Sequence, residues 1–477
     1  MVRLSVACFS IFCFLSTSSI AQTTWSLQSC IDHAFEHNLQ IKQSQLGTDR
    51  AELGYLSSQG AFLPTVNASA SHGYNIGMTI DPFTNDFATD AIQSNNLGLS
   101  SGITLFNGFK NHLNMRRARI GLDLAETNLE QTRNDLALTI SGAYLNILFQ
   151  EEFVNVARLN LETTRRQVER VTKLVDAGAS PASDLLDVRA QEASDAASLI
   201  SSENARFLAK LNLVQLLQLS GDEASNFEIV VPELGDLEVS PIPLSANAAV
   251  SHALSSFPQV RAAELNVEDS NLGLDIAKSS RLPRIFGSYS FGSGYSGNRI
   301  EGDIEPTTTD YTIMTEEGVL LLAPVTDFSN VIYSTVPFSD QLSDNINQSV
   351  FFSMSIPIFN GFSVRNSVEQ AKVNVLQSEY AQQSTNQVLR ASIESAWADA
   401  TAAQKTLVAQ EAALTAAELA FANTELRFEA GTISALEYAD ARTRLDNAKI
   451  GALRTRYDLV FKSKILDFYQ GKAITLR

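Results

Sequence analysis

Residues 105–109 have the sequence Leu-Phe-Asn-Gly-Phe, and residues 358–362 have the sequence Ile-Phe-Asn-Gly-Phe. Before each pentapeptide, apolar residues occupy alternate positions, the pattern of a strand with one apolar face. After each pentapeptide, apolar residues recur at alternating intervals of four and three, the pattern of a coiled-coil helix. The chain therefore contains the same strand-to-helix corner twice.

The duplication extends well beyond the corners. Tyr144 matches Trp397 at the same separation of 253 residues as the corners. Residues 38–41 match residues 257–260 at a separation of only 219, so the second copy contains an insertion of 34 residues. A stretch rich in Gly, Thr and Asp, residues 292–347, accounts for the insertion, and its composition predicts a long loop.

The matches divide the mature chain into three segments. We predict a first structural repeat over residues 22–225, a connector over residues 226–244 and a second repeat over residues 245–477. The connector contains three prolines, which exclude a continuous helix. Each repeat has the order helix, two strands, very long helix, helix.

Residues 1–21 have the features of a bacterial signal peptide. Arg3 precedes a short apolar stretch, and a Ser-Ile-Ala ending suits cleavage after Ala21. The apolar stretch is too short to span a membrane, and no later segment reaches 18 uncharged apolar residues. We expect an exported protein without a transmembrane helix.

Composition narrows the possible chemistry. The 477 residues carry 35 Lys and Arg against 53 Asp and Glu, and the formal net charge of −18 argues against binding to nucleic acid. Three Cys and five His cannot supply a disulfide framework or a large metal site. The sequence has no Gly-rich phosphate loop and no nucleophile elbow. We therefore expect no enzyme activity and no cofactor.

Each corner precedes an exceptionally long predicted helix. Residues 109–177 and 362–430 follow the heptad pattern, and each would be on the order of 100 Å long at 1.5 Å per residue. Gly178 and Gly431 stand where a left-handed residue ends a helix. After them, Ser180 is expected to cap a second helix and residues 434–437 to form a capping box. The seam contains four polar exceptions: Gln150, Thr164, Gln410 and Thr424.

Four strands of about ten residues are predicted at 66–74, 97–105, 285–291 and 350–358. Tilted strands of this length match the apolar band of an outer-membrane barrel. For the aromatic residues Tyr289 and Phe291 we favour a place in its girdle over ordinary sheet packing. Known barrels begin at about eight strands, and an open edge in lipid leaves backbone groups unpaired. The chain must therefore oligomerise.

At the duplicated corners, the Ala-Gly tips and residues 27–41, the sequence resembles the TolC-type outer-membrane efflux family. The resemblance covers nearly all of the mature chain. It implies an α+β membrane protein and a homotrimer, in which four strands per chain contribute to a 12-stranded β-barrel. A long α-helical coiled-coil barrel would continue from the outer membrane into the periplasm. It also implies docking to a periplasmic adaptor protein and to an inner-membrane pump or ABC transporter.

In that family, carboxylates near the helical tips line the periplasmic aperture. The matching residues here are Asp184 and Asp187 after the first tip, and Glu437 and Asp440 after the second. A ring of acids in a narrow pore favours cations. The alternative interpretation is that acids in a first helical turn simply stabilise the helix dipole. Ile433 departs from the family pattern, because some members have a basic residue there.

Other features favour ordinary structural roles. His33 and His37 form a His-x-x-Glu-His pattern without a recognisable third ligand, so we favour a solvated helix face over a zinc site. Tyr144 and Trp397 are assigned to packing. Two function classes remain: a passive exit duct for small molecules or proteins in a tripartite efflux or type I secretion system, and a structural periplasmic coiled-coil scaffold or adaptor. Four strands of lipid-spanning length favour the duct.

Overall fold

The computed structural model describes residues 24–81, 83–89, 91–231, 241–243, 245–318 and 320–472. The predicted signal peptide, residues 1–21, lies outside these residues. The chain divides into two compact units. The helical unit comprises Met1–Arg50, Asp123–Asn266 and Ser378–Arg477, and the sheet unit comprises Ala51–Leu122 and Val267–Gln377. Each unit takes equivalent segments from both halves of the sequence, so the units cut across the predicted repeats.

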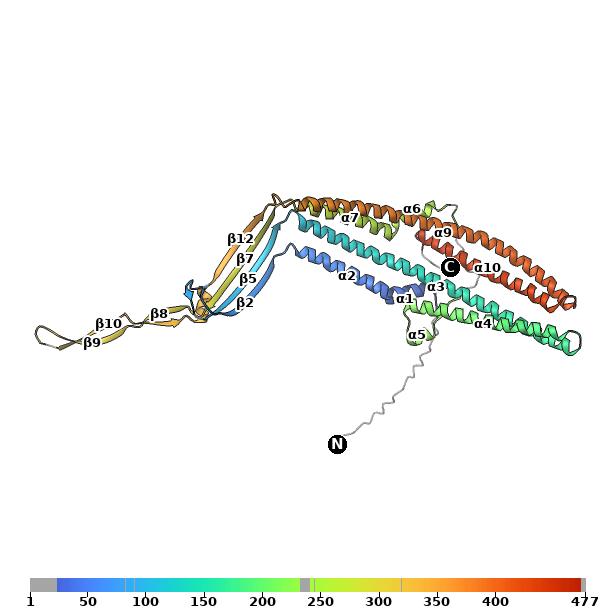
Figure 1. The fold of residues 1–477 in the computed structure, drawn as a ribbon, viewed down its shortest axis with the longest axis horizontal. Coiled ribbons are helices and arrows are strands. Elements are labelled where there is room, and N and C mark those ends of the chain that lie inside the picture. Colours follow the sequence, from blue (N-terminus) through green and yellow to red (C-terminus); the bar gives the residue numbers. More distant parts are fainter. Residues whose placement is uncertain are drawn as a thin grey trace, which may run out of the picture. The chain divides into compact units, whose positions relative to one another are not determined.

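The sheet unit is built on four antiparallel strands in the order β12-β7-β5-β2 (Figure 1). These strands are β2 (Thr65–Asn75), β5 (Ile92–Phe106), β7 (Arg284–Ser296) and β12 (Asn347–Ser355). All four predicted strands are confirmed, although β12 ends three residues before the predicted limit. Ile358 therefore belongs to the corner and not to the strand. Because β5 and β7 pair in the centre, β2 and β12 are left as free edges.

The prediction of a long loop over residues 292–347 was wrong. Residues 300–335 form an antiparallel ribbon, in which β8 (Ile300–Ile304) pairs with β11 (Val331–Thr335) and β9 (Thr307–Met314) pairs with β10 (Leu320–Asp327). Threonine, isoleucine and leucine within the strands outweigh the turn-forming residues, which gather between them. The composition was averaged over the whole stretch, and so it hid four short strands.

A short helix fastens the base of this ribbon to the sheet. In α8 (Phe338–Asp344), Gln341 is fully buried, and its amide nitrogen donates to the carbonyl groups of Ser296 (3.0 Å) and Val336 (2.9 Å). Its amide oxygen accepts from the N–H of Ser296 at 3.0 Å. The Ser296 hydroxyl donates to Asp81, next to the short strands β3 (Thr79–Ile80) and β4 (Phe87–Ala88). The buried side-chain amide of Gln341 therefore satisfies both backbone hydrogen-bonding groups of the last residue of β7.

Helices make up the rest of the described chain. They are α1 (Leu27–His37), α2 (Leu39–Gly60), α3 (Lys110–Asp176), α4 (Ala182–Leu217), α5 (Gly221–Ser225), α6 (Asn247–Ser256), α7 (Pro258–Ser279), α9 (Ser363–Glu429) and α10 (Ala435–Tyr469). The two long helices that follow the corners each have 67 residues without interruption, as predicted. In α3 the heptad positions Ile140, Ile147 and Val154 are fully buried, which confirms the seam.

Tyr144 and Trp397 occupy matching places and play matching roles. The Tyr144 hydroxyl donates to the Val230 carbonyl at 2.6 Å, beside the two-stranded pairing of β1 (Thr24–Trp25) with β6 (Glu228–Ile229). The Trp397 indole N–H donates to the Pro243 carbonyl at 2.8 Å. Each ring therefore bonds to one end of the predicted connector, Tyr144 at Val230 and Trp397 at Pro243, which confirms a packing role. Burial raises the pKa of the Tyr144 phenol, so it remains a donor.

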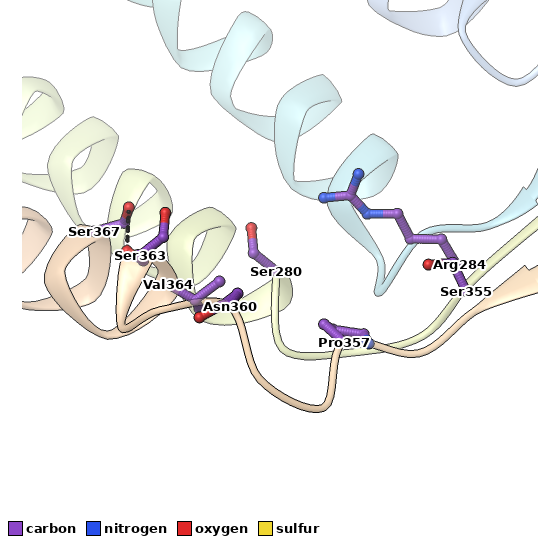
Figure 2. Close-up of a pocket in the computed structure, with 8 residues that line it drawn as sticks. All are labelled: Ser280, Arg284, Ser355, Pro357, Asn360, Ser363, Val364 and Ser367. Carbon is purple, nitrogen blue, oxygen red and sulfur yellow. Dashed lines mark hydrogen bonds between the residues drawn. The ribbon is translucent and has the colours of Figure 1, made fainter.

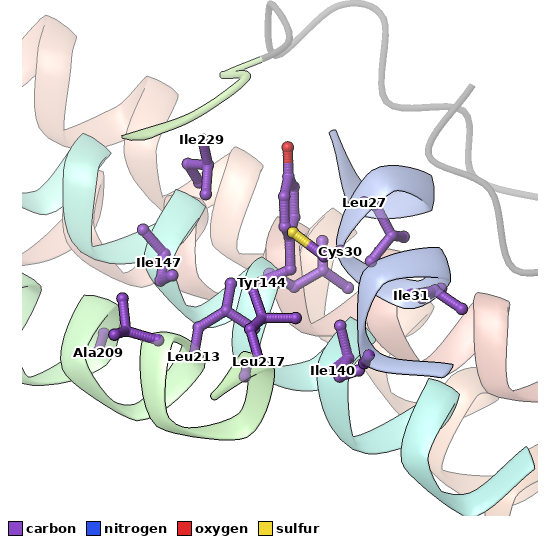
Figure 3. Packing of buried hydrophobic residues seen from close by; sticks show 14 of the residues in the cluster. Leu27, Cys30, Ile31, Ile140, Tyr144, Ile147, Ala209, Leu213, Leu217 and Ile229 are labelled. Carbon is purple, nitrogen blue, oxygen red and sulfur yellow. The ribbon is translucent and has the colours of Figure 1, made fainter. Parts of the chain in front are cut away.

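The polar residues of α1 have no metal-site geometry. The rings of His33 and His37 stack with centroids 4.1 Å apart, and His37 Nδ1 lies 3.0 Å from the His33 carbonyl oxygen. Within the described part of the chain, no group of three His, Cys, Asp or Glu side chains is placed to hold a metal ion. Cys30 is buried among apolar side chains (Figure 3), and burial raises its pKa to about 12.

The two Asn-Gly-Phe corners have the same backbone but different surroundings. Gly108 and Gly361 have φ values of 68° and 60°, in the left-handed region that favours glycine. A Cβ atom on Gly108 would lie 2.6 Å from the Ser279 carbonyl oxygen and 2.8 Å from Leu282 Cβ. A Cβ atom on Gly361 would meet no atom within 4 Å.

We predict that Gly108→Ala destabilises the protein more than Gly361→Ala does. The second substitution incurs only the left-handed strain of about 1–2 kcal/mol, whereas the first adds overpacking of about 1–3 kcal/mol. Thermal unfolding of the two purified variants under identical conditions measures the difference. Equal midpoints would contradict the close approach of the 279–282 turn to the first corner.

Candidate functional site at the helical tips

The two long helices end in the same hydrogen-bonded turn. After α3, the N–H of Gly178 donates to the Val175 carbonyl (2.9 Å) and the N–H of Ala179 donates to the Leu174 carbonyl (2.8 Å). After α9, the equivalent bonds of Gly431 and Thr432 are both 3.0 Å long. Gly178 and Gly431 have φ values of 74° and 71°. This pair of bonds and the left-handed glycine define a Schellman turn, which reverses the chain into α4 and α10.

The four predicted aperture carboxylates lie just beyond these turns. Asp184 and Asp187 belong to α4, and Glu437 and Asp440 belong to α10. Members of each pair are three residues apart and share one helix face. The two pairs are not joined to each other by any hydrogen bond or ion pair among the described residues. Asp187, Glu437 and Asp440 are exposed and have no side-chain partner in the described chain.

The two helix starts are capped differently. Ser434 caps α10 as predicted, because its hydroxyl oxygen accepts from the N–H of Glu437 at 3.3 Å. The prediction that Ser180 caps α4 was wrong: extended Pro181 takes the N-cap position, which leaves Ser180 one residue too far away. The Ser180 hydroxyl instead lies 2.6 Å from the Asp184 carboxylate. Asp184 is therefore anchored locally, whereas the Glu437 carboxylate is free.

An aromatic contact behind the acids joins the two helical hairpins. Tyr438 is buried, and its ring centroid lies 4.6 Å from that of Phe428 and 5.3 Å from that of Phe421. Its hydroxyl accepts a hydrogen bond from the Gln167 amide of α3. Phe428 also packs against a small cluster formed by Val171 of α3 and Val188 near the start of α4. Burial raises the pKa of the Tyr438 phenol.

A buried charge lies one turn further along α10. Arg442 is only 6 % exposed; its Nη2 donates to the Asn160 carbonyl of α3 at 2.7 Å, and its Nε lies 3.6 Å from Asp446 Oδ2. The remaining nitrogen, Nη1, is buried without a partner. Burial raises the pKa of the Asp446 carboxyl, and the positive charge of Arg442 opposes that rise. Nearer the turns, the ion pair of Arg170 with Glu429, 3.3 Å long, is about half exposed.

Sequence reasoning missed the side-chain contacts that join α3 to α4 and to α10. Thr164 was recognised as a polar exception in the seam, and the structure explains it: its buried hydroxyl donates to Asp195 of α4 at 2.5 Å. Tyr438 and Arg442 gave a weaker signal. They are the first members of the buried heptad stripe of α10, which continues with Leu445, Ala452 and Leu459. A charged residue at a heptad core position was the available clue.

No described helix is both long enough and apolar enough to cross a membrane. The strands of the sheet unit carry many exposed apolar side chains. On β12, Phe351 and Phe352 are 62 % and 68 % exposed and point to opposite faces.

Comparison with known proteins identifies the same architecture. The sequence profile of the outer membrane efflux protein family matches residues 30–218 and 249–471. The chain is 24 % identical over 462 residues to outer membrane protein TolC of Vibrio cholerae serotype O1, covering 94 % of this chain and 90 % of that protein. It is 20 % identical over 441 residues to outer membrane efflux protein BepC of Brucella suis biovar 1, covering 92 % and 84 %. The crystal structure of the Campylobacter jejuni CmeC outer membrane channel has the same fold, with a TM-score of 0.73 at 16 % identity, covering 100 % of this chain and 95 % of that one.

We predict that Arg442→Leu destabilises the protein by about 1–3 kcal/mol, because it removes the hydrogen bond to the Asn160 carbonyl and leaves the partly buried Asp446 carboxyl without its counter-charge. Arg170→Ala is the matched control, since it removes an exposed arginine between the same hairpins and should cost less than about 1 kcal/mol. Denaturant unfolding monitored by helical circular dichroism compares the two variants. Equal decreases in the free energy of unfolding would show that the burial of Arg442 has no energetic consequence.

Proposed function

The chain belongs to the outer membrane efflux protein family, and we propose that it forms the passive exit duct of a tripartite efflux or type I secretion system. Such a duct conducts small molecules or proteins across the outer membrane and the periplasm. The open four-stranded sheet carries the proposal, because its strands pass through the corners into helices of 67 residues. The chain would supply the conduit, and the energy would come from a partner.

Three copies would close the sheet. The edge strands β2 and β12 have 11 and 9 residues, long enough to cross the apolar layer when tilted. Pairing β12 of one copy with β2 of the next satisfies both edges. Two copies would give an eight-stranded barrel, whose interior is filled by side chains, whereas three give twelve strands and a lumen. A duct therefore favours the homotrimer.

The tips would form the periplasmic aperture. Asp187, Glu437 and Asp440 have no side-chain partner among the described residues, and a threefold arrangement would place copies of them around one axis. The concentrated negative charge would make this ring attractive to cations, and the positive N-terminal ends of the helix dipoles would favour the ionised carboxylates. Asp184, held by Ser180, would contribute a more fixed charge. The dipole interpretation and the aperture interpretation are compatible, because an acid in a first turn can serve both.

The proposed partners follow from this geometry. The outer membrane would hold the barrel, and the helical unit would extend into the periplasm to meet an adaptor protein. An inner-membrane pump or ABC transporter would drive export. The alternative of a periplasmic coiled-coil scaffold or adaptor leaves four strands with exposed apolar side chains unexplained.

We predict that the mature protein is recovered from the membrane fraction only with detergent, and that its mass by native mass spectrometry is that of a trimer. Exposed apolar side chains on strands of membrane-spanning length require a lipid or detergent environment. Recovery as a soluble periplasmic protein would support the scaffold instead. A detergent-solubilised monomer would contradict closure by copies of the chain.

We predict that the double substitution Glu437→Ala and Asp440→Ala raises single-channel conductance or lowers cation preference in planar bilayers. Removing two acids per copy weakens both the attraction for cations and any hydrogen bonds that narrow the aperture. The matched control is Glu411→Ala with Glu418→Ala, which removes two exposed acids from α9 away from the tip. Unchanged conductance and selectivity in the tip variant would exclude the aperture role.

A further inference from the structure

The charges of the sheet unit are strongly segregated. Residues 300–364 contain no Lys or Arg, although the ribbon and its base contain nine Asp and Glu. Arg299, which directly precedes this stretch, pairs with Asp344 at the base of the ribbon, but most other cations of this unit gather where the strands meet the helices. Five of them are Lys110, Arg116, Arg281, Arg284 and Arg365. In an acidic chain, this concentration at one level of the sheet unit requires a physical explanation.

These five cations are not neutralised by the described chain. The acids nearby are already engaged, because Asp269 pairs with Arg117, Asp275 with Lys278 and Glu369 with Lys372. No ion pair or side-chain hydrogen bond joins the five to any described residue. We call them the basic collar. Lys110 and Arg365 also lie in the first turns of α3 and α9, which contain no acid and where the helix dipole disfavours a positive charge.

A cavity opens within the collar. It has a volume of about 370 Å³ and is lined by Arg284 and Asn360 together with several serines (Figure 2). Ser280 directly follows the last residue of α7, and Ser363 and Ser367 belong to the first turns of α9. The Ser367 hydroxyl already donates to the Ser363 carbonyl at 3.0 Å, which leaves the Arg284 guanidinium and the hydroxyl groups of Ser280, Ser355 and Ser363 as donors that suit a phosphate. No carboxylate lines this cavity.

Exposed apolar side chains accompany the cations. Ile358 and Phe359 are 95 % and 77 % exposed, and Phe362 and Phe109 are also exposed. Aromatic and aliphatic residues at one level, with cations beside them, are typical of the boundary between hydrocarbon and headgroups. A neighbouring copy is a weaker candidate for neutralising the charge. The start of its β2 edge, residues 60–66, contains no acid.

We propose that the basic collar binds the phosphate groups of anionic membrane phospholipids, and that the cavity beside Arg284 receives one of them. The inference rests on the proposed duct, in which the sheet unit lies in the outer membrane. The corner residues Phe359 and Phe362 enter the acyl boundary while the arginines reach the phosphates. Lipid binding would thereby fix the depth of the barrel in the membrane.

The test uses the detergent-purified full-length mature protein and native mass spectrometry, with dioleoyl phosphatidylglycerol or dioleoyl phosphatidylcholine added. We expect the wild-type protein to retain phosphatidylglycerol preferentially. The triple substitution Arg281→Ala, Arg284→Ala and Arg365→Ala should weaken that binding about a hundredfold, since each cation near a charged membrane surface contributes about one factor of five. The triple change to Lys should retain most of the binding. Arg133→Ala, Arg390→Ala and Lys405→Ala form the control, because they remove three exposed cations of the helical unit.

Several outcomes would overturn the proposal. Equal retention of the two lipids by the wild-type protein would show that the collar does not recognise anionic headgroups, and this arm needs no variant. Displacement of phosphatidylglycerol by inorganic phosphate at equal concentration would assign the cavity to free phosphate. A wild-type trimer that binds no lipid would assign the collar to a neighbouring copy. The same spectrum reports the oligomer, so a monomeric mass contradicts the proposed duct and not the lipid site alone.

Discussion

The unmade backbone hydrogen bonds of β2 and β12 are the constraint on which the architecture depends. In water these groups bond to solvent, but in hydrocarbon each unpaired group costs several kcal/mol. Neither edge can pair with the other within one chain, because β5 and β7 separate them. In the proposed duct, assembly and membrane insertion would therefore be coupled for this sheet. The alternation of small polar and apolar residues along β2 suits a strand with one face toward a lumen and one toward lipid.

Sheet order also explains why two nearly identical corners differ in their surroundings. The first corner follows β5, a central strand, and the turn between α7 and β7 packs against Gly108. The second corner follows β12, an edge strand, and nothing covers Gly361. Duplication of the sequence therefore gave the same local conformation twice, while topology assigned only one copy an intramolecular neighbour. The exposed second corner is the surface left for lipid or another subunit.

Local patterns in the sequence were enough to predict the strands, the long helices and the tip turns, because period, glycine position and heptad spacing are short-range properties. The ribbon at residues 300–335 was missed because composition was averaged over a stretch that contains alternating segments. The contacts of Tyr438 and Arg442 with α3 were missed for another reason. Their partners Gln167 and Asn160 are more than 270 residues away in the chain, and no local pattern specifies such a pairing.

The positions of these long-range contacts set where the hairpins can separate. Seven residues of α10, 435–441, precede Arg442, about 10 Å of helix at 1.5 Å per residue. On the tip side, the hairpins are joined by the half-exposed pair of Arg170 with Glu429 and by the contacts of Tyr438. Parting them beyond Arg442 would also break the bond to Asn160 and rearrange a buried charge. Separation of the hairpins that began at the turns would therefore be least costly if it stopped before Arg442.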